Sequence, residues 1–484
     1  MRHLIIAAAL FFSVCSLGQQ STVPEELLTI ENGLVPPRIV EGTTPVTYNL
    51  IERMQELNVP GVSIAVVRDG KIRFSKGYGM ANTATGTKVN EETLFQAGSI
   101  SKPLAALGAL KLVEEGILDL DTDVNTYLKN WKVPNNEFTK EQKITLRQLL
   151  THTAGTTVHG FPGYNQQESM PSTIGVLDGR GNTDALDIDT EPGTNWRYSG
   201  GGYTIIELIV EEVTGMELDA YLDPMILTPL GMSNSTFAQP LPENKHAKAS
   251  AAYTADGKII DGHWNNYPEQ AAAGLWTTPT DLANYYIRIQ EIMAGERQNP
   301  LTKSTVEQML TKHKNEWGLG PTLKTIDGEL LFGHGGKNAG FSNNMMGYVN
   351  KGDAAIVMTN GDNGTKIMQE ILASISSAYS WDMVKSQKIK VTSPSLEVLN
   401  AISGNYKSKR QILPVGDFIV TMKIVNGQLT GVDNTDGEVI HFSQIDNLKF
   451  MNVPSGNSIE FHRDADNNIN TMTYNGQLEF IKIE

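Results

Sequence analysis

The order of strand-like and helix-like segments between residues 60 and 380 is the feature that most constrains the fold of this chain. Two β-rich runs near its start, residues 62–67 and 72–78, are joined at Asp69-Gly70. Because glycine accepts the positive φ of a tight turn, this spacing predicts a β-hairpin. Short β-rich runs return near the end, and helical patterns lie between. The sequence therefore predicts an α+β fold, with an antiparallel sheet flanked by helices and an all-helical subdomain.

The helical patterns are regular enough to be placed by residue number. Segment 102–115 is amphipathic, with apolar residues spaced by three and four: Leu107, Leu110, Val113 and Ile117. The same reading predicts further helices over residues 146–151, 203–214, 280–293 and 367–379. It predicts strands over residues 330–333, 344–349 and 354–359, which would complete the sheet.

The last ninety or so residues have a different pattern. Residues 383–394 are polar and lysine-rich and end at a proline, which predicts a linker. Beyond it, short β-rich runs are punctuated by Asn426-Gly427, Asp436-Gly437 and Asn475-Gly476. Such punctuation predicts a small all-β barrel or sandwich over residues 395–484.

The first residues predict export. Arg2 and His3 precede the apolar run 4–14, and small residues follow up to Gly18. This is the pattern of a signal peptide over residues 1–18, and the run is shorter than the ~20 residues that span a bilayer. The alternative is a lipid anchor on Cys15, which Val14 disfavours because small residues normally precede a lipidated cysteine. We therefore expect a periplasmic or extracellular protein whose residues 19–45 form an extended N-terminal segment.

Composition removes several classes of chemistry and of partner. Cys15 is the only cysteine, so the mature chain would have no disulfide and no thiol nucleophile. The 54 acidic and 39 basic residues give a net charge of −15, which repels nucleic acid. The nine histidines are scattered and no H-E-x-x-H occurs, so the sequence predicts no metal site and no cofactor. A small molecule or a peptide is the expected partner.

One tetrapeptide can activate a serine. Ser99-Ile100-Ser101-Lys102 is the only S-x-x-K of the chain, and it stands between a predicted strand end and the predicted helix 102–115. Positions i and i+3 of a helix share one face, so Lys102 can reach Ser99 and take its proton. The free N–H groups at the start of the helix would suit an oxyanion. Taken alone this motif is weak, because a chain of this length holds about one by chance.

Two further motifs follow in order. Tyr198-Ser199-Gly200 precedes the predicted helix 203–214, and His334-Gly335-Gly336 precedes a predicted strand pair. A tyrosine beside the serine can act as a phenolate or as a proton relay. A glycine-rich strand edge lets a substrate backbone approach closely.

The ordered set resembles the serine β-lactamase-like family, over about residues 46–380. This family includes class C β-lactamases, low-molecular-weight penicillin-binding proteins, D-alanyl-D-alanine carboxypeptidases and related esterases. Flanking stretches are also similar: LLTHTAG at 149–155, EPG at 191–193 and GLWTTPTDL at 274–282. The resemblance implies a catalytic domain over residues 46–382. The C-terminal segment resembles, more weakly, a lipocalin-like barrel.

The resemblance also implies roles for individual residues. Ser99 would be the acylated nucleophile, and Lys102 and Tyr198 would share the work of the base, with no choice between them. The backbone N–H groups of Ser99 and Lys337 would form the oxyanion hole. The other residues expected at the substrate are Gly200, His334, Gly335 and Gly336.

Two positions depart from the family pattern. The second motif usually reads Tyr-x-Asn, but residue 200 is glycine, so an amide that would orient the substrate is missing. The third motif often begins with lysine, whereas here it begins with His334, and a neutral imidazole binds a carboxylate poorly. Lys337 lies at an odd spacing from His334, which places it on the other face of a strand. Both departures favour an esterase or a peptidase of relaxed specificity.

Other active-site patterns fit less well. No G-x-S-x-G motif, P-loop or dinucleotide fingerprint occurs. His152 in the LLTHTAG stretch could be a catalytic base, but a histidine at a helix end more often satisfies local backbone groups.

The leading hypothesis is thus an exported serine hydrolase that cleaves an amide or ester through a Ser99 acyl-enzyme. D-amino-acid peptides, β-lactams and small esters are the candidate substrates. The alternative is a non-catalytic protein of the same fold that binds penicillins or peptidoglycan fragments, which Gly200 and His334 motivate. A third possibility assigns ligand binding to the C-terminal barrel.

Overall fold

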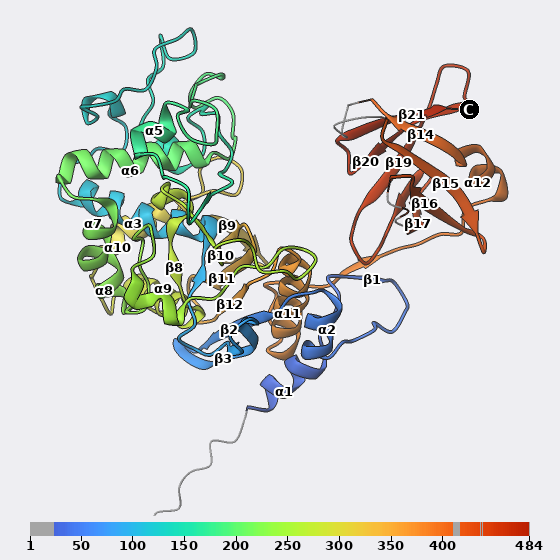
Figure 1. Cartoon of the computed structure of the whole chain (residues 1–484), viewed down its shortest axis with the longest axis horizontal. Coiled ribbons are helices and arrows are strands. Elements are labelled where there is room, and N and C mark those ends of the chain that lie inside the picture. Colours follow the sequence, from blue (N-terminus) through green and yellow to red (C-terminus); the bar gives the residue numbers. More distant parts are fainter. Residues whose placement is uncertain (1–23, 410–416, 436, 438, 484) are drawn as a thin grey trace, which may run out of the picture.

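The computed structural model describes residues 24–409, 417–435, 437 and 439–483. Its centre is a seven-stranded antiparallel sheet in the order β4-β3-β2-β12-β11-β10-β9 (Figure 1). The strands are β2 (Gly61–Arg68), β3 (Lys71–Asn82), β4 (Thr87–Lys88), β9 (Thr322–Ile326), β10 (Glu329–Asn338), β11 (Phe341–Tyr348) and β12 (Ala354–Thr359). The first and last strands of the region thus meet at the centre, where Val62 pairs with Thr359.

The predicted hairpin forms where the Asp-Gly pair stands. Asp69 has φ 50° and Gly70 has φ 71°, so both central residues of the turn are left-handed. Two such residues match the right-handed twist of the flanking strands β2 and β3. The dipeptide therefore sets the register of the hairpin, with Arg68 opposite Lys71.

Both faces of the sheet are covered. Strand β2 shows this, because its alternate residues point to opposite faces. Ile64 and Val66 pack in one core with helices α1 (Glu25–Asn32), α2 (Leu50–Glu56) and α11 (Gly364–Ala378). Ala65 and Val67 belong to the other core, beside α3 (Ser101–Glu114) and α9 (Pro279–Ala294) (Figure 1). The predicted α+β class is confirmed.

The insertion between β5 and β9 is mainly helical. Its helices are α3, α4 (Leu146–Leu150), α5 (Thr173–Leu177), α6 (Gly200–Thr214), α7 (Leu218–Leu222), α8 (Thr228–Leu230), α9 and α10 (Lys303–Met309). Shorter turns are η1 (Gly98–Ile100), η2 (Val124–Thr126), η3 (Asp223–Leu227), η4 (Glu243–Lys248) and η5 (Gln270–Gly274). Two small ladders join it, β5 (Phe95–Gln96) with β8 (Trp276–Thr277) and β6 (Tyr164–Asn165) with β7 (Asn265–Asn266).

The expectation of an extended segment over residues 19–45 was wrong for part of that segment. Residues 25–32 form α1, which buries Leu27 and Ile30 against α11. Further on, β1 (Arg38–Val40) pairs in parallel with β13 (Gln387–Ile389), inside the predicted linker. The expected signal peptide, including Cys15, lies outside the described residues. Among those described, no helix is long and apolar enough to cross a membrane.

The C-terminal segment is a closed barrel of eight antiparallel strands with one short helix, α12 (Leu396–Ile402). The strands are β14 (Gly404–Ser408), β15 (Ile419–Val425), β16 (Gln428–Asp433), β17 (Val439–Asp446), β18 (Lys449–Met451), β19 (Ser458–Arg463), β20 (Ile469–Tyr474) and β21 (Leu478–Ile483). The barrel has its own core, separate from the two cores of the sheet. The expected all-β C-terminal barrel is confirmed.

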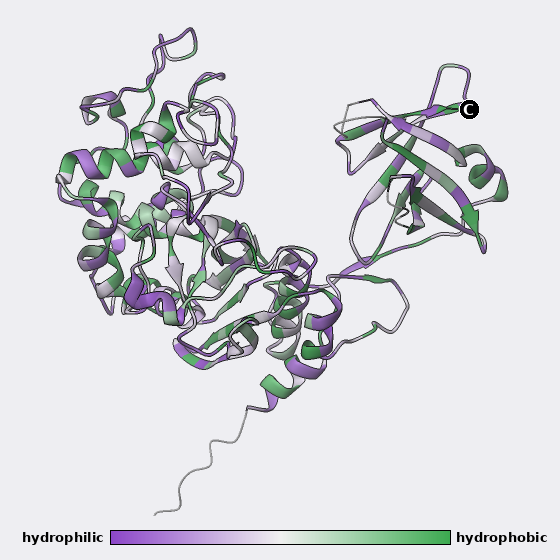
Figure 2. Cartoon of the chain, viewed as in Figure 1, coloured by the Kyte–Doolittle hydropathy of each residue, from purple (hydrophilic) through white to green (hydrophobic). Residues whose placement is uncertain are grey.

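Figure 2 shows where the apolar residues gather. The central strands of the sheet and the helices against them are largely hydrophobic, while hydrophilic residues concentrate in loops and on outer helix surfaces. This distribution matches the burial of β12, whose six residues are all buried. Strand β10, which carries His334, belongs to the same sheet and is separated from this buried strand by β11.

Candidate functional site

Ser99 lies in the turn η1, directly before α3. The side chain is half-buried, whereas its neighbours on both sides are buried. Gly98 has φ 56°, a left-handed conformation that strains other residues. Ser101 fastens the turn, because its Oγ donates to Gly98 O at 2.6 Å and accepts from the Leu275 N–H at 3.0 Å. The sequence thus holds Ser99 in a tight turn before α3, where its side chain is partly exposed.

Lys102 contacts Ser99 as the i, i+3 spacing predicts. Its Nζ is 3.1 Å from Ser99 Oγ and donates to Ala272 O at 2.8 Å. The side chain is buried, and no carboxylate among the described residues forms an ion pair with it. Burial therefore lowers the pKa of Lys102 to about 7. An amine with such a pKa is partly neutral near pH 7 and can accept a proton.

Tyr198 lies beside this amine. Lys102 Nζ is 5.0 Å from the centroid of the tyrosine ring. Burial raises the pKa of the Tyr198 hydroxyl well above its usual value, and the nearby Ser99 hydroxyl opposes that shift only in part. The hydroxyl is buried and makes no hydrogen bond of full geometry with a described residue. Tyr198 is therefore a neutral phenol rather than a phenolate at neutral pH.

His152 contacts both Tyr198 and the residue that follows it. Its Nδ1 accepts the backbone N–H of Ser199 at 3.2 Å, and its ring lies 4.3 Å from that of Tyr198. Since Nδ1 accepts, the proton is on Nε2. Burial and the nearby Lys102 hold the pKa of His152 well below its ordinary value. A neutral imidazole that satisfies a backbone group agrees with the structural interpretation of this residue.

Strand β10 reaches the serine through two glycines. A Cβ on Gly336 would lie 1.9 Å from Ala97 O, and a Cβ on Gly98 would lie 2.6 Å from the backbone N of Lys337. Only glycine at both positions lets the strand pack backbone-to-backbone against η1. The backbone N–H of Lys337 is thereby brought beside the turn that carries Ser99.

His334 lies in the same strand and faces inward. Its Nδ1 donates to Gly335 O, so Nε2 carries no proton, and Nε2 is buried without a partner among the described residues. Burial and Lys102 lower the pKa of His334 to about 3. The third motif therefore presents a neutral acceptor where a lysine would present a charge.

Two of the expected substrate residues are engaged elsewhere. The Lys337 side chain points away from His334 and donates to Asp362 O at 2.9 Å, as its odd spacing predicts. Gly200 donates its N–H to His159 O at 3.0 Å. A Cβ at position 200 would also lie 2.9 Å from the ring of Phe161, so an asparagine there would require that ring to shift. The N–H of Gly200 is thus not available to a substrate.

The motifs did not reveal every residue at the site. Ala272 O fixes Lys102, but a backbone carbonyl leaves no mark in a sequence. Trp317 packs edge-on against both His152 and His334, at 4.9 and 5.5 Å between ring centroids. It belongs to no motif, and its place follows only from the fold.

Comparisons with known proteins place this geometry in context. The chain is 31% identical over 243 residues to esterase EstB of Burkholderia gladioli, a match that covers 47% of this chain and 60% of the esterase. It is 27% identical over 242 residues to protein flp of Staphylococcus aureus strain N315, covering 49% of this chain and 46% of that protein. The chain therefore spans about half the length of these relatives.

A solved structure is similar over most of the chain. The octameric penicillin-binding protein homologue from Pyrococcus abyssi matches with a TM-score of 0.62 and 22% identity, covering 90% of this chain and 98% of that chain. At this identity the likeness concerns the fold alone. The family profile described as beta-lactamase matches residues 48–379. That match spans more than half of the sequence, so the chain belongs to the serine β-lactamase-like family.

Proposed function

We propose that this protein is an exported serine hydrolase that cleaves an ester or amide bond through an acyl-enzyme on Ser99. The observation that carries the proposal is the 3.1 Å contact between Ser99 Oγ and Lys102 Nζ, together with a lysine pKa of about 7. A serine needs an adjacent base to become a useful nucleophile, and a buried, partly neutral lysine is such a base. The family membership and the esterase among the relatives agree with this chemistry.

In the proposed reaction, neutral Lys102 takes the proton of Ser99 while Oγ bonds to the substrate carbonyl carbon. The backbone N–H groups of Ser99 and Lys337 stabilise the resulting oxyanion. The proton then passes from Lys102 through the Tyr198 hydroxyl to the leaving group as the ester or amide bond breaks. A water molecule reverses these roles, giving a proton to Lys102 while its oxygen attacks the acyl carbon. The bond between the acyl carbon and Ser99 Oγ then breaks, Lys102 returns its proton to Oγ, and the carboxylic acid leaves.

We assign the base to Lys102 rather than Tyr198. The pKa of Tyr198 is raised by burial, which disfavours a phenolate, whereas the same burial favours the neutral form of Lys102. Tyr198 would then serve as the proton relay, held in place by the ring of His152.

We infer a preference for substrates without a carboxylate beside the scissile bond. His334 stays neutral above about pH 4, and the Lys337 ammonium is held at Asp362 on the other face of β10. Small esters should therefore be better substrates than penicillins or peptides that end in D-alanine. The unprotonated Nε2 of His334 would accept a hydrogen bond from a substrate hydroxyl or amide N–H.

The test begins with a fluorophosphonate and intact-mass measurement on the mature protein. A single adduct is expected, and Ser99→Ala should abolish it. Lys102→Met should slow labelling by at least about a hundredfold, the usual contribution of a general base. Turnover of p-nitrophenyl esters, a D-alanyl-D-alanine peptide and a penicillin then ranks the substrates. Labelling without turnover of any of them would favour the non-catalytic binding protein, and absence of an adduct would refute an activated serine.

A further inference from the structure

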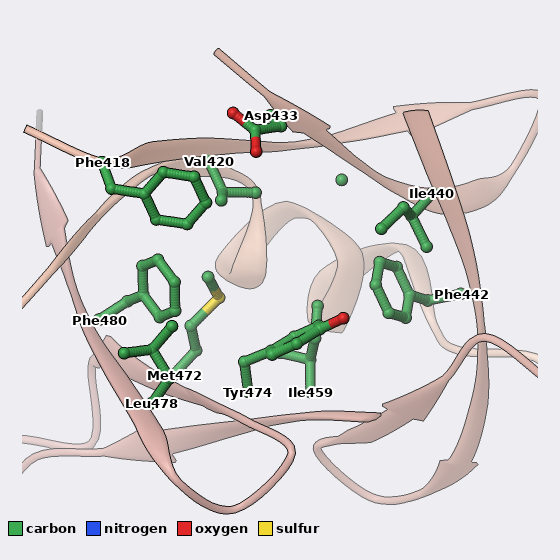
Figure 3. Close-up of a pocket in the computed structure, with 11 residues that line it drawn as sticks. Phe418, Val420, Asp433, Ile440, Phe442, Ile459, Met472, Tyr474, Leu478 and Phe480 are labelled. Atoms are coloured by element: carbon green, nitrogen blue, oxygen red, sulfur yellow. The ribbon is translucent and has the colours of Figure 1, made fainter. Parts of the chain in front are cut away.

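The C-terminal barrel is hollow at one end. A cavity of about 300 Å³ opens among inward-facing side chains of strands β15, β16, β17, β19, β20 and β21 (Figure 3). Its wall is mostly aromatic and aliphatic and includes Val420, Phe442, Ile459, Met472 and Phe480. The cavity lies in a different part of the chain from Ser99.

The cavity results from the distribution of large side chains along the barrel. Outside the cavity lining, Tyr406 and Phe450 both pack against Phe461, and the Tyr406 hydroxyl donates to Ile402 O of α12 at 2.9 Å. At the open end, β16 contributes Gly431, where a Cβ would point between Phe442 and Met422 at 3.2 and 3.3 Å. Glycine at this position therefore lets the side chains of Phe442 and Met422 lie close against β16.

The volume is too large for a packing defect. Protein interiors contain few voids larger than a water molecule, whereas small-molecule sites begin near 300 Å³. An apolar cavity of about 150 Å³ holds one benzene ring, so this one accepts about a dozen non-hydrogen atoms. The wall offers such a molecule mainly apolar contacts.

One charged side chain stands at the rim. Asp433 is the only charged residue of the described lining, and Figure 3 shows its carboxylate at the edge of the cavity, beside Val420. Its Oδ1 accepts the backbone N–H of Thr435, which holds the carboxylate in place. A fixed negative charge attracts a ligand cation and repels a ligand carboxylate.

We propose that the barrel binds a small apolar amine, with its hydrocarbon body in the cavity and its ammonium group beside Asp433. This binding is independent of the chemistry proposed for Ser99. The assignment excludes fatty acids, although an apolar barrel alone would accept them, because their carboxylate would face Asp433.

The test uses the full chain and two probes of one shape. Titration calorimetry is carried out with 4-phenylbutylamine and with 4-phenylbutyrate, which differ in the sign of their charge. The amine should bind with a Kd on the order of 0.1–1 mM, as its size allows. The carboxylate should bind at least about fivefold more weakly, the effect of a charge at a solvated rim. No binding of the amine, or equal binding of both probes, would overturn the proposal.

Matched variants locate the binding. Ile459→Phe fills the cavity, whereas Ile481→Phe places the same change on the outer surface of β21, where Ile481 is 45% exposed. Only the first should abolish binding of the amine, and both should still react with fluorophosphonate at Ser99. Asp433→Asn removes the charge at nearly constant volume and should bring the two probes to equal affinity. If Ile459→Phe fails to fold, the Asp433→Asn variant still tests the proposal. Unchanged amine binding in a folded Ile459→Phe variant would place the site elsewhere.

Discussion

Lys102 illustrates how one buried residue links chemistry and stability. Its ammonium group loses hydration on folding and gains no carboxylate among the described residues, so the folded state favours the neutral amine. The unfolded chain, with water around the same side chain, favours the charged form. The two states therefore bind different numbers of protons between the folded pKa of about 7 and the unfolded pKa of about 10.4.

The rate should follow this ionisation. If neutral Lys102 is the base, kcat/KM for a small ester should rise with pH through about 7 and then level off. Below that pKa it should fall about tenfold per pH unit, because only the neutral fraction reacts. Initial rates from pH 5 to 9, corrected for spontaneous hydrolysis, measure this limb. A rate independent of pH between 5.5 and 8 would contradict the assignment.

In Lys102→Met, stability should change in the opposite sense to activity. A lowered folded pKa destabilises the protein wherever the unfolded lysine is charged, and this cost shrinks as pH rises from 7 to 10. Lys102→Met removes the cost, so the variant should be inactive yet more stable at pH 7. Its advantage should fall by about 1 kcal/mol per pH unit up to pH 10.

Urea unfolding at several pH values measures this difference. The exposed Lys71 gives the matched control, since Lys71→Met should show no comparable trend. A Lys102→Met variant less stable than the parent at pH 7 would mean that lost packing outweighs the relief of desolvation.

At the scale of elements, strand β10 and turn η1 depend on each other. They pack through glycines rather than through side chains, so the position of the oxyanion candidates is set by backbone contact. Asn338 adds a side-chain tie, donating to Gln96 Oε1 at 3.0 Å and to Ala273 O at 3.1 Å. Neither of these two hydrogen bonds involves Ser99 or Lys102.

A single methyl group at this contact should be costly. In Gly336→Ala the new Cβ would meet Ala97 O at 1.9 Å, so β10 must move away from Ser99. A shift of about 1 Å at a reacting centre costs about a hundredfold in kcat/KM. The buried Gly361→Ala is the control, because its Cβ would make ordinary contacts of 3.4 Å. Equal activities of the two variants, measured on the same ester, would show that the contact does not position the site.

Helix α1 allows a test of its contribution to the core. Ile30 is fully buried, whereas Leu28 on the same helix is 49% exposed. Ile30→Ala should lower the free energy of unfolding by about 2–4 kcal/mol, and Leu28→Ala by less than about 1 kcal/mol. Urea unfolding of both variants measures the difference. Similar small losses would mean that α1 is not part of the cooperative fold.

Elements with local signals were predictable, and those held by distant contacts were not. The Asp69-Gly70 hairpin and α3 follow from turn chemistry and periodicity. The observed bounds of β2 and α3 lie within one residue of the expected ones, whereas β3 runs four residues further, to Asn82. Helix α1 was missed because it has only two turns and its stability comes from α11, far along the chain. Strand β1 was missed for a similar reason, because its partner β13 lies far along the chain, in a segment that was predicted to be a linker.

The candidate site divides in the same way. Ser99, Lys102, Tyr198 and His334 carry side-chain chemistry in ordered motifs, so their proximity could be expected. Ala272 O and the closed space beside Gly200 depend on loops whose course no motif specifies. The sequence therefore predicted which side chains lie together better than it predicted the backbone groups that hold them.

At the scale of the whole molecule, few hydrogen bonds between described residues join the barrel to the rest of the chain. Thr392 pairs with Gln444, and Arg38 donates to Ser455 O at 3.2 Å. The hydrophobic cores on either side share no residue. Domains joined in this way generally fold as separate units.

A chain that ends at residue 393 should therefore keep its activity on small esters. We expect kcat/KM within about threefold of the full chain, because no described barrel residue contacts Ser99 or Lys102. Steady-state kinetics on one ester compares the two proteins. Loss of activity in a truncated protein that is folded by circular dichroism would show that the barrel contributes to catalysis.

The pairing of β2 with β12 has a consequence for how the chain folds during its synthesis. These central strands are separated by nearly three hundred residues, and the whole helical insertion lies between them. Contacts over such separations form slowly, because the intervening loop must first be closed. During synthesis the serine and its lysine emerge early, but strand β10 has no completed sheet to lie in until β12 has followed. A growing chain would thus assemble the candidate site only after β12 has been made, at residue 359 of 484, while the barrel is still to follow.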